Sequence, residues 1–281
     1  MGLIFKLDDY PGYLERVGGA AYVDLTRRTD PARIPEVWDN LRAVVEAYGA
    51  PWIVQVWTKD AAGTLAHGRR LLERLADAGT ALAAQVTVTG LGSTAWEPLV
   101  PAEPFAGVAE MAALVGGPEH VCWRFDPVIP GVSRLDTFQR LAARAAALGI
   151  RRGVVNFLAP PGRYARVDAR LASLLPGWRE GMPGYDLDWQ AQMAVKLVRA
   201  ACDAGIELAA CAESSGLPAL VPGLRASACG DHAWFVALSG RDPGRARGSA
   251  SRRGCGCAAY FDAGCYGRWA RCHRCAYCYA G

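Results

Sequence analysis

The feature that most constrains the fold is an alternation of short strand-like runs with helix-like segments between residues 20 and 211. The strand-like runs are rich in valine, alanine and aromatic residues and are short enough for buried strands. They lie at residues 20–25, 52–57, 83–88, 121–125, 154–158 and 207–211. Between them, apolar residues recur at helical spacing, as at Ile34, Val37, Leu41 and Val44. The pattern therefore predicts repeated βα units.

Strands that alternate with helices form a parallel sheet. Six such units favour an α/β fold with a full or partial TIM-like barrel over the alternative, a doubly wound sheet. The chain has 281 residues, 52% of them hydrophobic, which is enough to bury one sizeable core. We expect a barrel-like domain over residues 1–240, a flexible Gly/Ser/Arg linker or lid over 241–253, and a cysteine-rich tail over 254–281. The tail is expected to pack over the C-terminal ends of the strands.

Polar residues gather at or just after the ends of the strand-like runs. In a parallel barrel these ends converge on one mouth, so we expect the side chains to face one cavity. Each of them taken alone is also typical of a turn or a helix cap. They are Arg27, Arg28 and Asp30 after the first run, Thr58 and Lys59 after the second, Thr87 at the third, Arg124 and Asp126 at the fourth, Asn156 within the fifth, and Glu213 after the sixth.

The tail holds six of the ten cysteines within its last 27 residues, and Cys272, Cys275 and Cys278 are spaced two and two. Thiolates at this spacing can converge on one metal site, and iron-sulfur clusters are built from such runs. Cys255 and Cys257 stand upstream; they could close the cluster as a fourth ligand, or pair with Cys272 and Cys275 around zinc. Three cysteines in one short loop exceed what a two-pair zinc site needs, which favours iron.

Composition argues against several other classes of function. The net charge is only +4, which argues against nucleic-acid binding although residues 241–253 are basic. No apolar run is long enough for a membrane helix and the first residues do not read as a secretory signal, so a cytoplasmic protein is expected. In that reducing compartment a cysteine cluster favours metal or catalysis over disulfides. Phosphate-loop, dinucleotide, zinc-protease and hydrolase-elbow motifs are absent from the sequence.

The other cysteines divide into two groups. Cys122 and Cys202 fall in a strand-like and a helix-like segment and are expected to be small buried apolar residues. Cys211 and Cys229 lie nearer the expected rim. For these two, simple burial and a role as a substrate or radical-chemistry thiol both remain open.

The motifs in their order resemble a bacterial domain family of unknown function, number eighteen forty-eight, from about Tyr22 to the last residue. They are TRRTD at 26–30, VWTKD at 56–60, TVTGLG at 87–92, WRFDP at 123–127, CAE at 211–213 and the terminal CGC, DAGCY and CAYCYA. The resemblance implies a C-terminal cysteine cluster similar to the one that binds a 4Fe-4S cluster in the radical SAM superfamily. Members of the family come without an assigned reaction.

The resemblance implies roles for particular residues of this chain. Cys272, Cys275 and Cys278 would bind three irons and leave the fourth open to S-adenosylmethionine, with Tyr277 near the adenine. Rim carboxylates would serve catalysis, and the remaining rim residues would bind S-adenosylmethionine or a small-molecule substrate. The carboxylates are Asp30, Asp126 and Glu213; the binding residues are Arg27, Arg28, Thr58, Lys59, Thr87, Arg124 and Asn156. An electron donor such as ferredoxin or flavodoxin is implied as a partner.

Two features depart from the superfamily. The first two cysteines are usually separated by three residues, whereas only His273 and Arg274 separate Cys272 from Cys275. Cys265 could therefore act as a ligand instead of Cys272 or beside it, and His273 is a nitrogen donor inside the loop. The superfamily also has its cluster loop after the first barrel strand, whereas here the loop comes last. A circular permutation would explain that order, with the strand before TRRTD taking the place of the one that follows the cluster loop.

Overall fold

The computed structural model describes residues 5–211, 216–246, 256–264 and 267–280. Its centre is one sheet in which every pair of neighbouring strands is parallel. The strands are β1 (Tyr22–Leu25), β2 (Ile53–Thr58), β3 (Ala81–Thr87), β4 (Val121–Val128), β5 (Arg152–Phe157), β6 (Glu207–Ala210), β7 (Arg225–Ala226) and β8 (Phe261–Asp262). Their order is β7-β6-β5-β4-β3-β2-β1-β8. The expected α/β architecture is confirmed as a partial, TIM-like barrel, open between β7 and β8 within the described residues.

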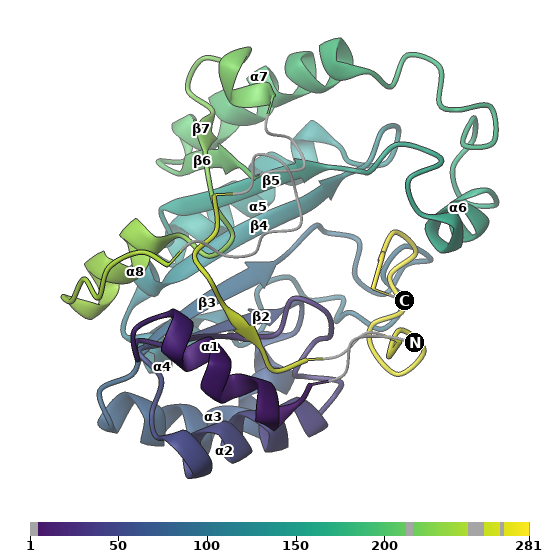
Figure 1. Ribbon diagram of the computed structural model, residues 1–281. Helices are drawn as coiled ribbons and strands as arrows, with labels where there is room; N and C mark the ends of the chain where they lie inside the picture. Colours follow the sequence, from purple (N-terminus) through teal and green to yellow (C-terminus); the bar gives the residue numbers. More distant parts are fainter. Residues whose placement is uncertain (1–4, 212–215, 247–255, 265–266, 281) are drawn as a thin grey trace.

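Helices follow most of the strands and cover the sheet (Figure 1). They are α1 (Tyr10–Arg16), α2 (Glu36–Tyr48), α3 (Ala61–Asp77), α4 (Val108–Val115), α5 (Leu135–Ala147), α6 (Ala165–Leu171), α7 (Leu187–Asp203) and α8 (His232–Ser239), with short 3-10 turns η1 (Leu7–Asp9), η2 (Pro118–His120) and η4 (Leu217–Ala219). Asp60 and Asp186 are the N-cap residues of α3 and α7, and each carboxylate accepts a hydrogen bond from a backbone N–H of the first turn. Such caps satisfy donors that a helix leaves unpaired.

Alternate residues of each strand point to opposite faces of the sheet. One set, which includes Val23, Val54 and Trp123, packs in the main core with the outer helices. The other set lines the inner face; its lower layer comprises Tyr22, Ile53, Ala83, Cys122 and Val154 and packs against Trp234 and Phe235 of α8. The inner face is therefore closed by α8 at the end where the strands begin. Farther along the strands it becomes polar.

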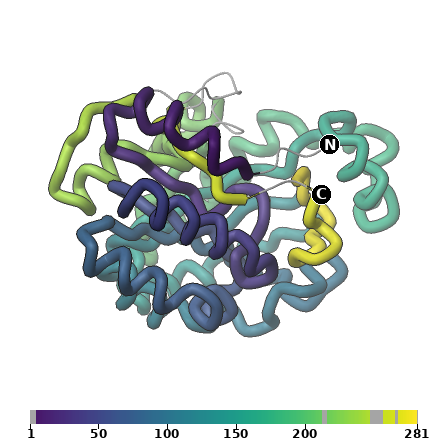
Figure 2. Tube along the Cα trace, turned by 60° about the horizontal axis from the view of Figure 1, so that its bottom comes forward, coloured from purple at the N-terminus to yellow at the C-terminus, as the bar shows by residue number. Residues whose placement is uncertain are grey.

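The cysteine-rich tail contributes to the sheet before it reaches the strand ends. β8 pairs with β1 through Val23 with Phe261 and Asp24 with Asp262. Residues 267–280 then lie beside the C-terminal ends of the strands and near α6, as the two views agree (Figures 1 and 2). Of the expected linker at 241–253, residues 247–253 lie outside the described part of the chain.

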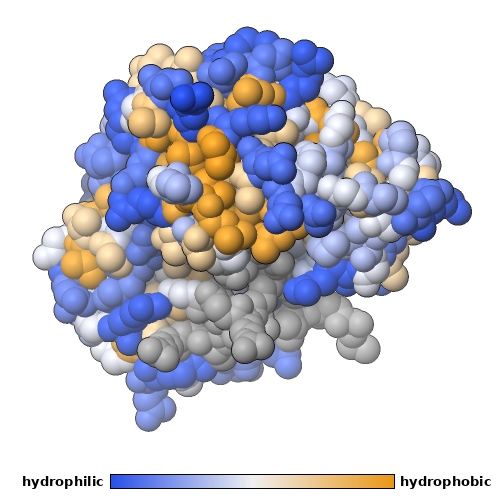
Figure 3. Space-filling model, turned by 90° about the horizontal axis from the view of Figure 1, so that it is seen from above, coloured by the Kyte–Doolittle hydropathy of each residue, from blue (hydrophilic) through white to orange (hydrophobic). Residues whose placement is uncertain are grey.

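Figure 3 shows the face seen from above Figure 1, where apolar side chains gather in a patch bordered by hydrophilic ones. Leu187 and Val195 of α7 and Leu220 after η4 are among the large apolar residues exposed to solvent. No helix in the described residues is both long and apolar enough to cross a membrane.

Candidate functional site

A cavity of about 380 Å³ opens at the C-terminal ends of the strands. Its wall combines strand-end residues with tail residues that are far away in sequence. Among the strand-end residues are Arg27, Arg28, Asp30, Trp57, Thr58, Lys59, Thr87, Arg124, Asp126 and Asn156; among the tail residues are Cys257, Tyr260, Asp262, Trp269, Cys272, His273, Cys275, Tyr277 and Cys278. The volume lies within the range of small-molecule sites.

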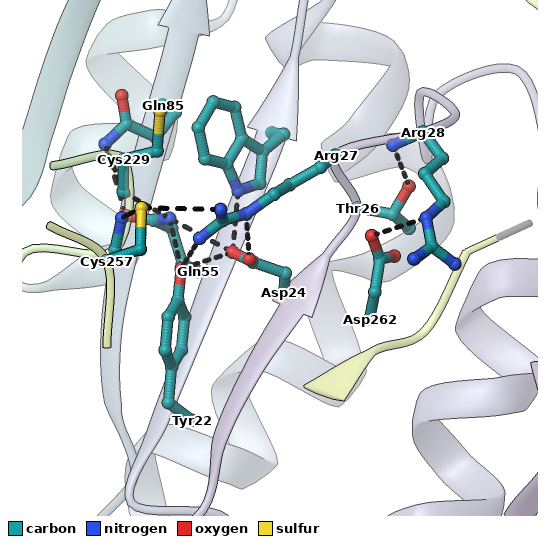
Figure 4. A network of polar contacts seen from close by, with 12 residues as sticks. Tyr22, Asp24, Thr26, Arg27, Arg28, Gln55, Gln85, Cys229, Cys257 and Asp262 are labelled. Carbon is teal, nitrogen blue, oxygen red and sulfur yellow. Dashed lines mark hydrogen bonds and ion pairs between the residues drawn. The ribbon is translucent and has the colours of Figure 1, made fainter. Parts of the chain in front are cut away.

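Behind the cavity wall lies a buried polar network centred on Asp24, which we call the floor network and which reaches the wall through Arg27 and Trp57 (Figure 4). The Asp24 carboxylate has no exposed surface. It accepts hydrogen bonds from Tyr22 Oη at 2.5 Å, Trp57 Nε1 at 2.8 Å and Gln55 Nε2 at 3.1 Å, and pairs with the Arg27 guanidinium. Arg27 also lies over the ring of Tyr260, with 3.8 Å from Cζ to the ring centroid. A buried charge this well paired holds Arg27 in one orientation at the cavity wall.

The network continues across the sheet to the carboxylate of Asp126. Gln85 Nε2 donates to Gln55 Oε1 at 3.2 Å, and Arg124 Nη1 donates to Gln85 Oε1 at 3.4 Å. Arg124 Nη2 then lies 2.5 Å from Asp126 Oδ2, which also accepts from Asn156 Nδ2 at 2.9 Å. Burial acts to raise the pKa of Asp126, but the Arg124 charge, the hydrogen bonds from Arg124 and Asn156 and the Lys59 charge together hold the pKa below its ordinary value.

Asp30 fastens the tail to the strand ends. Its carboxylate accepts from Thr58 Oγ1 at 2.9 Å and the Lys59 N–H at 2.6 Å, and it lies 3.0 Å from His273 Nε2. The Asp30 N–H in turn donates to Cys272 Sγ at 3.4 Å. Burial acts to raise the pKa of Asp30, but the His273 charge and the hydrogen bonds hold it below its ordinary value. Both oxygens of the Asp30 carboxylate thus have partners, and we interpret Asp30 as a residue that positions Cys272.

A second attachment joins the tail to the loop after β3. Lys59 Nζ lies 2.9 Å from Glu97 Oε1, and Tyr277 Oη donates to the same oxygen. The Ala276 N–H donates to the Trp96 carbonyl at 2.9 Å. From the opposite side, Arg170 of α6 donates to the carbonyls of Ala276 and Cys278. The tail segment that holds the three cysteines is therefore fixed on both flanks.

Cys272, Cys275 and Cys278 all line the cavity. Burial raises the pKa of Cys272 to about 11 and raises the pKa of Cys275 and Cys278 as well. A cation bound by these sulfurs would favour their thiolates and displace their protons. In the described part of the chain, no three His, Cys, Asp or Glu side chains are arranged to hold a metal ion. The three sulfurs share a cavity without converging as the ligands of a single ion do.

A second group of sulfurs lies on another wall of the cavity; we call Cys211, Cys229 and Cys257 the wall thiols. Cys211 Sγ is 3.1 Å from Cys229 Sγ. Cys257 Sγ accepts from the Gly230 N–H at 3.4 Å and lies 3.6 Å from Arg27 Nη1. The expected burial of Cys122 is observed, whereas that of Cys202 is wrong, because its side chain is exposed. Cys202 lies on the outward side of α7, whose preceding residues Ala200 and Ala201 are still buried.

All the predicted rim residues except Glu213 line this one cavity. Glu213, Cys255 and Cys265 lie outside the described residues. Six further polar or aromatic residues at or next to the site, all buried or half-buried, were not predicted from the sequence: Asp24, Gln55, Gln85, Glu97, Tyr260 and Asp262. A signal existed for the first three: each is a polar residue inside an otherwise apolar strand-like run, and a buried polar residue is an informative exception.

Comparison with known proteins yields one family and weak likenesses of structure. The family model described as Domain of unknown function (DUF1848) matches residues 44–280. No curated protein matches the chain. Two structures of the carboxyl transferase domain from Rhizobium etli pyruvate carboxylase, one with oxamate and biotin and one with pyruvate and biocytin, are similar with TM-scores of 0.35 and 0.34 and identities of 15% and 16%. Both matches cover 83% of this chain, which spans only 34% and 33% of theirs.

Proposed function

The chain belongs to the DUF1848 family, and from this premise we propose that it is a radical-SAM-like iron-sulfur enzyme acting on a small molecule. In this proposal Cys272, Cys275 and Cys278 hold a 4Fe-4S cluster that faces the cavity. Such a cluster with one open iron, when bound, supplies an electron to S-adenosylmethionine. A small electron-transfer protein such as ferredoxin or flavodoxin is the proposed reductant.

The observation that carries the proposal is the shared cavity. The three tail sulfurs and the strand-end polar residues line the same space of about 380 Å³, so a group held by the tail would meet a reactant held by the barrel. Iron-sulfur clusters are built from short cysteine runs of this kind, and three cysteines in one loop exceed what a two-pair zinc site needs, which favours iron-sulfur over zinc.

The strand order supports the proposal independently of the cysteines. The tail loop leaves the sheet after β8, and β8 pairs in parallel with β1. Read from β8, the sheet runs β8, β1, β2 and onward, so the loop follows the first strand in space although it comes last in the sequence. A circular permutation of the superfamily order would give this arrangement.

The charges around the cavity favour a reactant that carries charges of both signs over a polyanion. Arg27 pairs with Asp24, Arg28 with Asp262, Lys59 with Glu97 and Arg124 with Asp126. Because each of these cations is already balanced by a carboxylate, the cavity offers paired charges of both signs to a ligand that carries both. S-adenosylmethionine, with its ammonium and sulfonium cations and its carboxylate, carries charges of both signs. A polyanion would have to displace internal partners.

Within this proposal the chain's own residues position the cysteines and the reactant and shield them from water. Asp30 and His273 fix the first cysteine, while Glu97 and Lys59 fix Tyr277 beside the last. Asp126 and Asn156 present a carboxylate and an amide from the strand ends. They are the proposed contacts for the reactant, since both line the cavity. Trp57 and Tyr260 close the wall around Arg27 and reduce the access of water.

The test is anaerobic reconstitution of the full chain with iron and sulfide, followed by iron, sulfide and zinc analysis. We expect a brown protein with about four irons per chain and a spectrum that changes when S-adenosylmethionine is added to the reduced form. Cys278→Ser is expected to lose most of the iron. Cys202→Ser, which changes an exposed thiol outside the cavity, is the matched control and is expected to keep it.

Cys257→Ser distinguishes the proposed three-cysteine cluster from a cluster closed by a fourth cysteine and from a zinc site. If Cys257 closed the cluster or paired with the tail around zinc, the substitution would lower metal content as much as Cys278→Ser does. We expect full iron content instead, because Cys257 contacts Arg27 and Gly230 on the other wall. Zinc as the sole bound metal, or iron retained in Cys278→Ser, would refute the proposal.

A further inference from the structure

One wall of the cavity carries a pair of sulfurs that the proposed cluster does not use. Cys211 Sγ and Cys229 Sγ are 3.1 Å apart, about 1 Å farther than the bonded sulfurs of a disulfide. Both residues line the cavity. They come from separate parts of the chain, since Cys211 directly follows β6 and Cys229 lies between β7 and α8. The approach is therefore a product of the fold and not of sequence proximity.

The floor network holds both residues where they are. The Cys211 N–H donates to Asn156 Oδ1 at 3.3 Å. The Cys229 carbonyl accepts from Gln55 Nε2 at 3.1 Å and from Gln85 Nε2 at 3.5 Å. Because these side chains are buried in the polar network of the sheet, the two sulfurs are held close together by groups that cannot easily move.

Positive charge lies close to the pair. Arg124, which lines the cavity with them, acts electrostatically on Cys211 and Cys229, and Arg27 acts on Cys229 and Cys257. The hydrogen bond with Cys229 lowers the pKa of Cys211 to about 7; burial opposes this shift, and the Arg124 charge supports it. A thiolate beside a second thiol is the arrangement that thiol-disulfide exchange requires.

We propose that Cys211 and Cys229 are a redox-active dithiol of the cavity, which exchanges with small disulfides and closes to an intramolecular disulfide. Cys211 Sγ attacks one sulfur of the disulfide, forms a mixed disulfide and releases one thiol. Cys229 Sγ then attacks Cys211 Sγ and releases the second thiol. One disulfide bond is broken and one is formed; the two electrons and two protons of the dithiol pass to the two released thiols. The proposal is independent of the iron-sulfur function.

The test uses the full chain under anaerobic conditions in glutathione buffers of defined oxidised-to-reduced ratio. The samples are quenched with acid, alkylated and digested with trypsin. Cleavage places Cys211 in the peptide 200–225 and Cys229 in the peptide 226–241, so the proposed bond links these two peptides. We expect the linked pair to dominate in oxidised glutathione and to disappear on return to reduced glutathione. Since Cys202 shares the first peptide, the measurement is repeated in Cys202→Ser, where the link is expected to remain.

Single substitutions assign the roles of the two sulfurs. Cys229→Ser is expected to stop at a glutathione adduct on Cys211, and Cys211→Ser to lower the linked peptides at least tenfold. A link from 226–241 to the peptide 254–268, which contains Cys257, would overturn the assignment. So would the absence of any link under conditions that modify the exposed Cys202. Iron content is read in parallel, so failure of the cluster and failure of the dithiol are distinguished.

Discussion

Glu97 joins the tail to the barrel at the level of single side chains. Its side chain is 2% exposed, and its carboxylate pairs with Lys59 and accepts a hydrogen bond from Tyr277. Glu97→Gln removes the counter-charge of a half-buried ammonium, and breaking such a pair from one side costs roughly 3 kcal/mol. We expect urea unfolding to show a loss of that order. The control is Glu103→Gln, since Glu103 pairs with Arg144 in solvent; there we expect a loss below about 1 kcal/mol. Equal losses would contradict this account of the attachment.

Asp262 gives the site a pH dependence. Burial, with Asp24 nearby, raises its pKa to about 6, although Arg28 lies 3.4 Å away. Because the folded pKa exceeds the ordinary value near 3.8, folding favours the protonated acid. That contribution is complete below about pH 3.8 and is lost as the pH rises through about 6.

The side chain of Asp262→Asn does not titrate in this range, whereas the native chain loses stability as Asp262 ionises. The stability of the variant relative to the native chain is therefore expected to increase between pH 4.5 and pH 7.5. The increase should approach about 2 kcal/mol. Chemical denaturation of both proteins at the two pH values measures it. A difference in stability that is constant with pH would show that Asp262 is ionised across the whole range.

At this scale the sequence predicted the polar residues at the strand ends and missed those inside the strands. Arg27, Lys59 and Asp126 could be found because they follow apolar runs and because parallel strands end at one mouth. Gln55 and Gln85 sit within such runs, and their role depends on the register that sets them beside Asp24 and Arg124. Register between strands comes from tertiary packing, which a single sequence does not reveal.

At the scale of elements, the contact between α2 and α3 depends on the absence of a side chain at Gly68. A Cβ at that position would lie 2.0 Å from the Trp38 ring, and Trp38 is held by its Nε1 donating to the Pro31 carbonyl at 3.0 Å. Gly68→Ala therefore overpacks the contact, and we expect a loss of about 1–3 kcal/mol in chemical unfolding.

Gly12 of α1 provides the matched control, because a Cβ there meets nothing within 4 Å. Gly12→Ala is expected to be neutral or to stabilise by up to about 1 kcal/mol through helix propensity. Similar destabilisation by both substitutions would mean that backbone effects, and not the Trp38 contact, dominate at Gly68.

The principal strands and helices could be predicted because their periodicity extends over four or more residues. β7 and β8, of two residues each, are too short to leave such a pattern. β8 is the more consequential of the two, because it attaches the tail to β1 and determines where the cysteine loop begins. Its position follows from packing of the tail against the barrel edge, where the Ala263 N–H also donates to the Asp24 carbonyl at 3.0 Å.

At the scale of the whole molecule, the fold collects two sets of sulfurs and a ring of paired charges around one cavity. Tail cysteines and wall thiols, separated in sequence by up to 67 residues between Cys211 and Cys278, line the same space. The parallel sheet achieves this because its strands end on one side and its last strand returns the chain to the first. Cysteine spacing predicted a metal site, and the strand pattern predicted that the tail lies over the strand ends; the structure adds which residues of the tail and of the strands line the same cavity.

The most direct test of the central claim is cleavage of S-adenosylmethionine by the reconstituted, reduced protein. The claim is that the tail thiols hold an iron-sulfur cluster with an iron accessible from the cavity. We expect the native chain with dithionite to form 5′-deoxyadenosine, and Cys278→Ser under the same conditions to form none above background. A fully iron-loaded native protein that forms no 5′-deoxyadenosine and shows no spectral change with S-adenosylmethionine would contradict it.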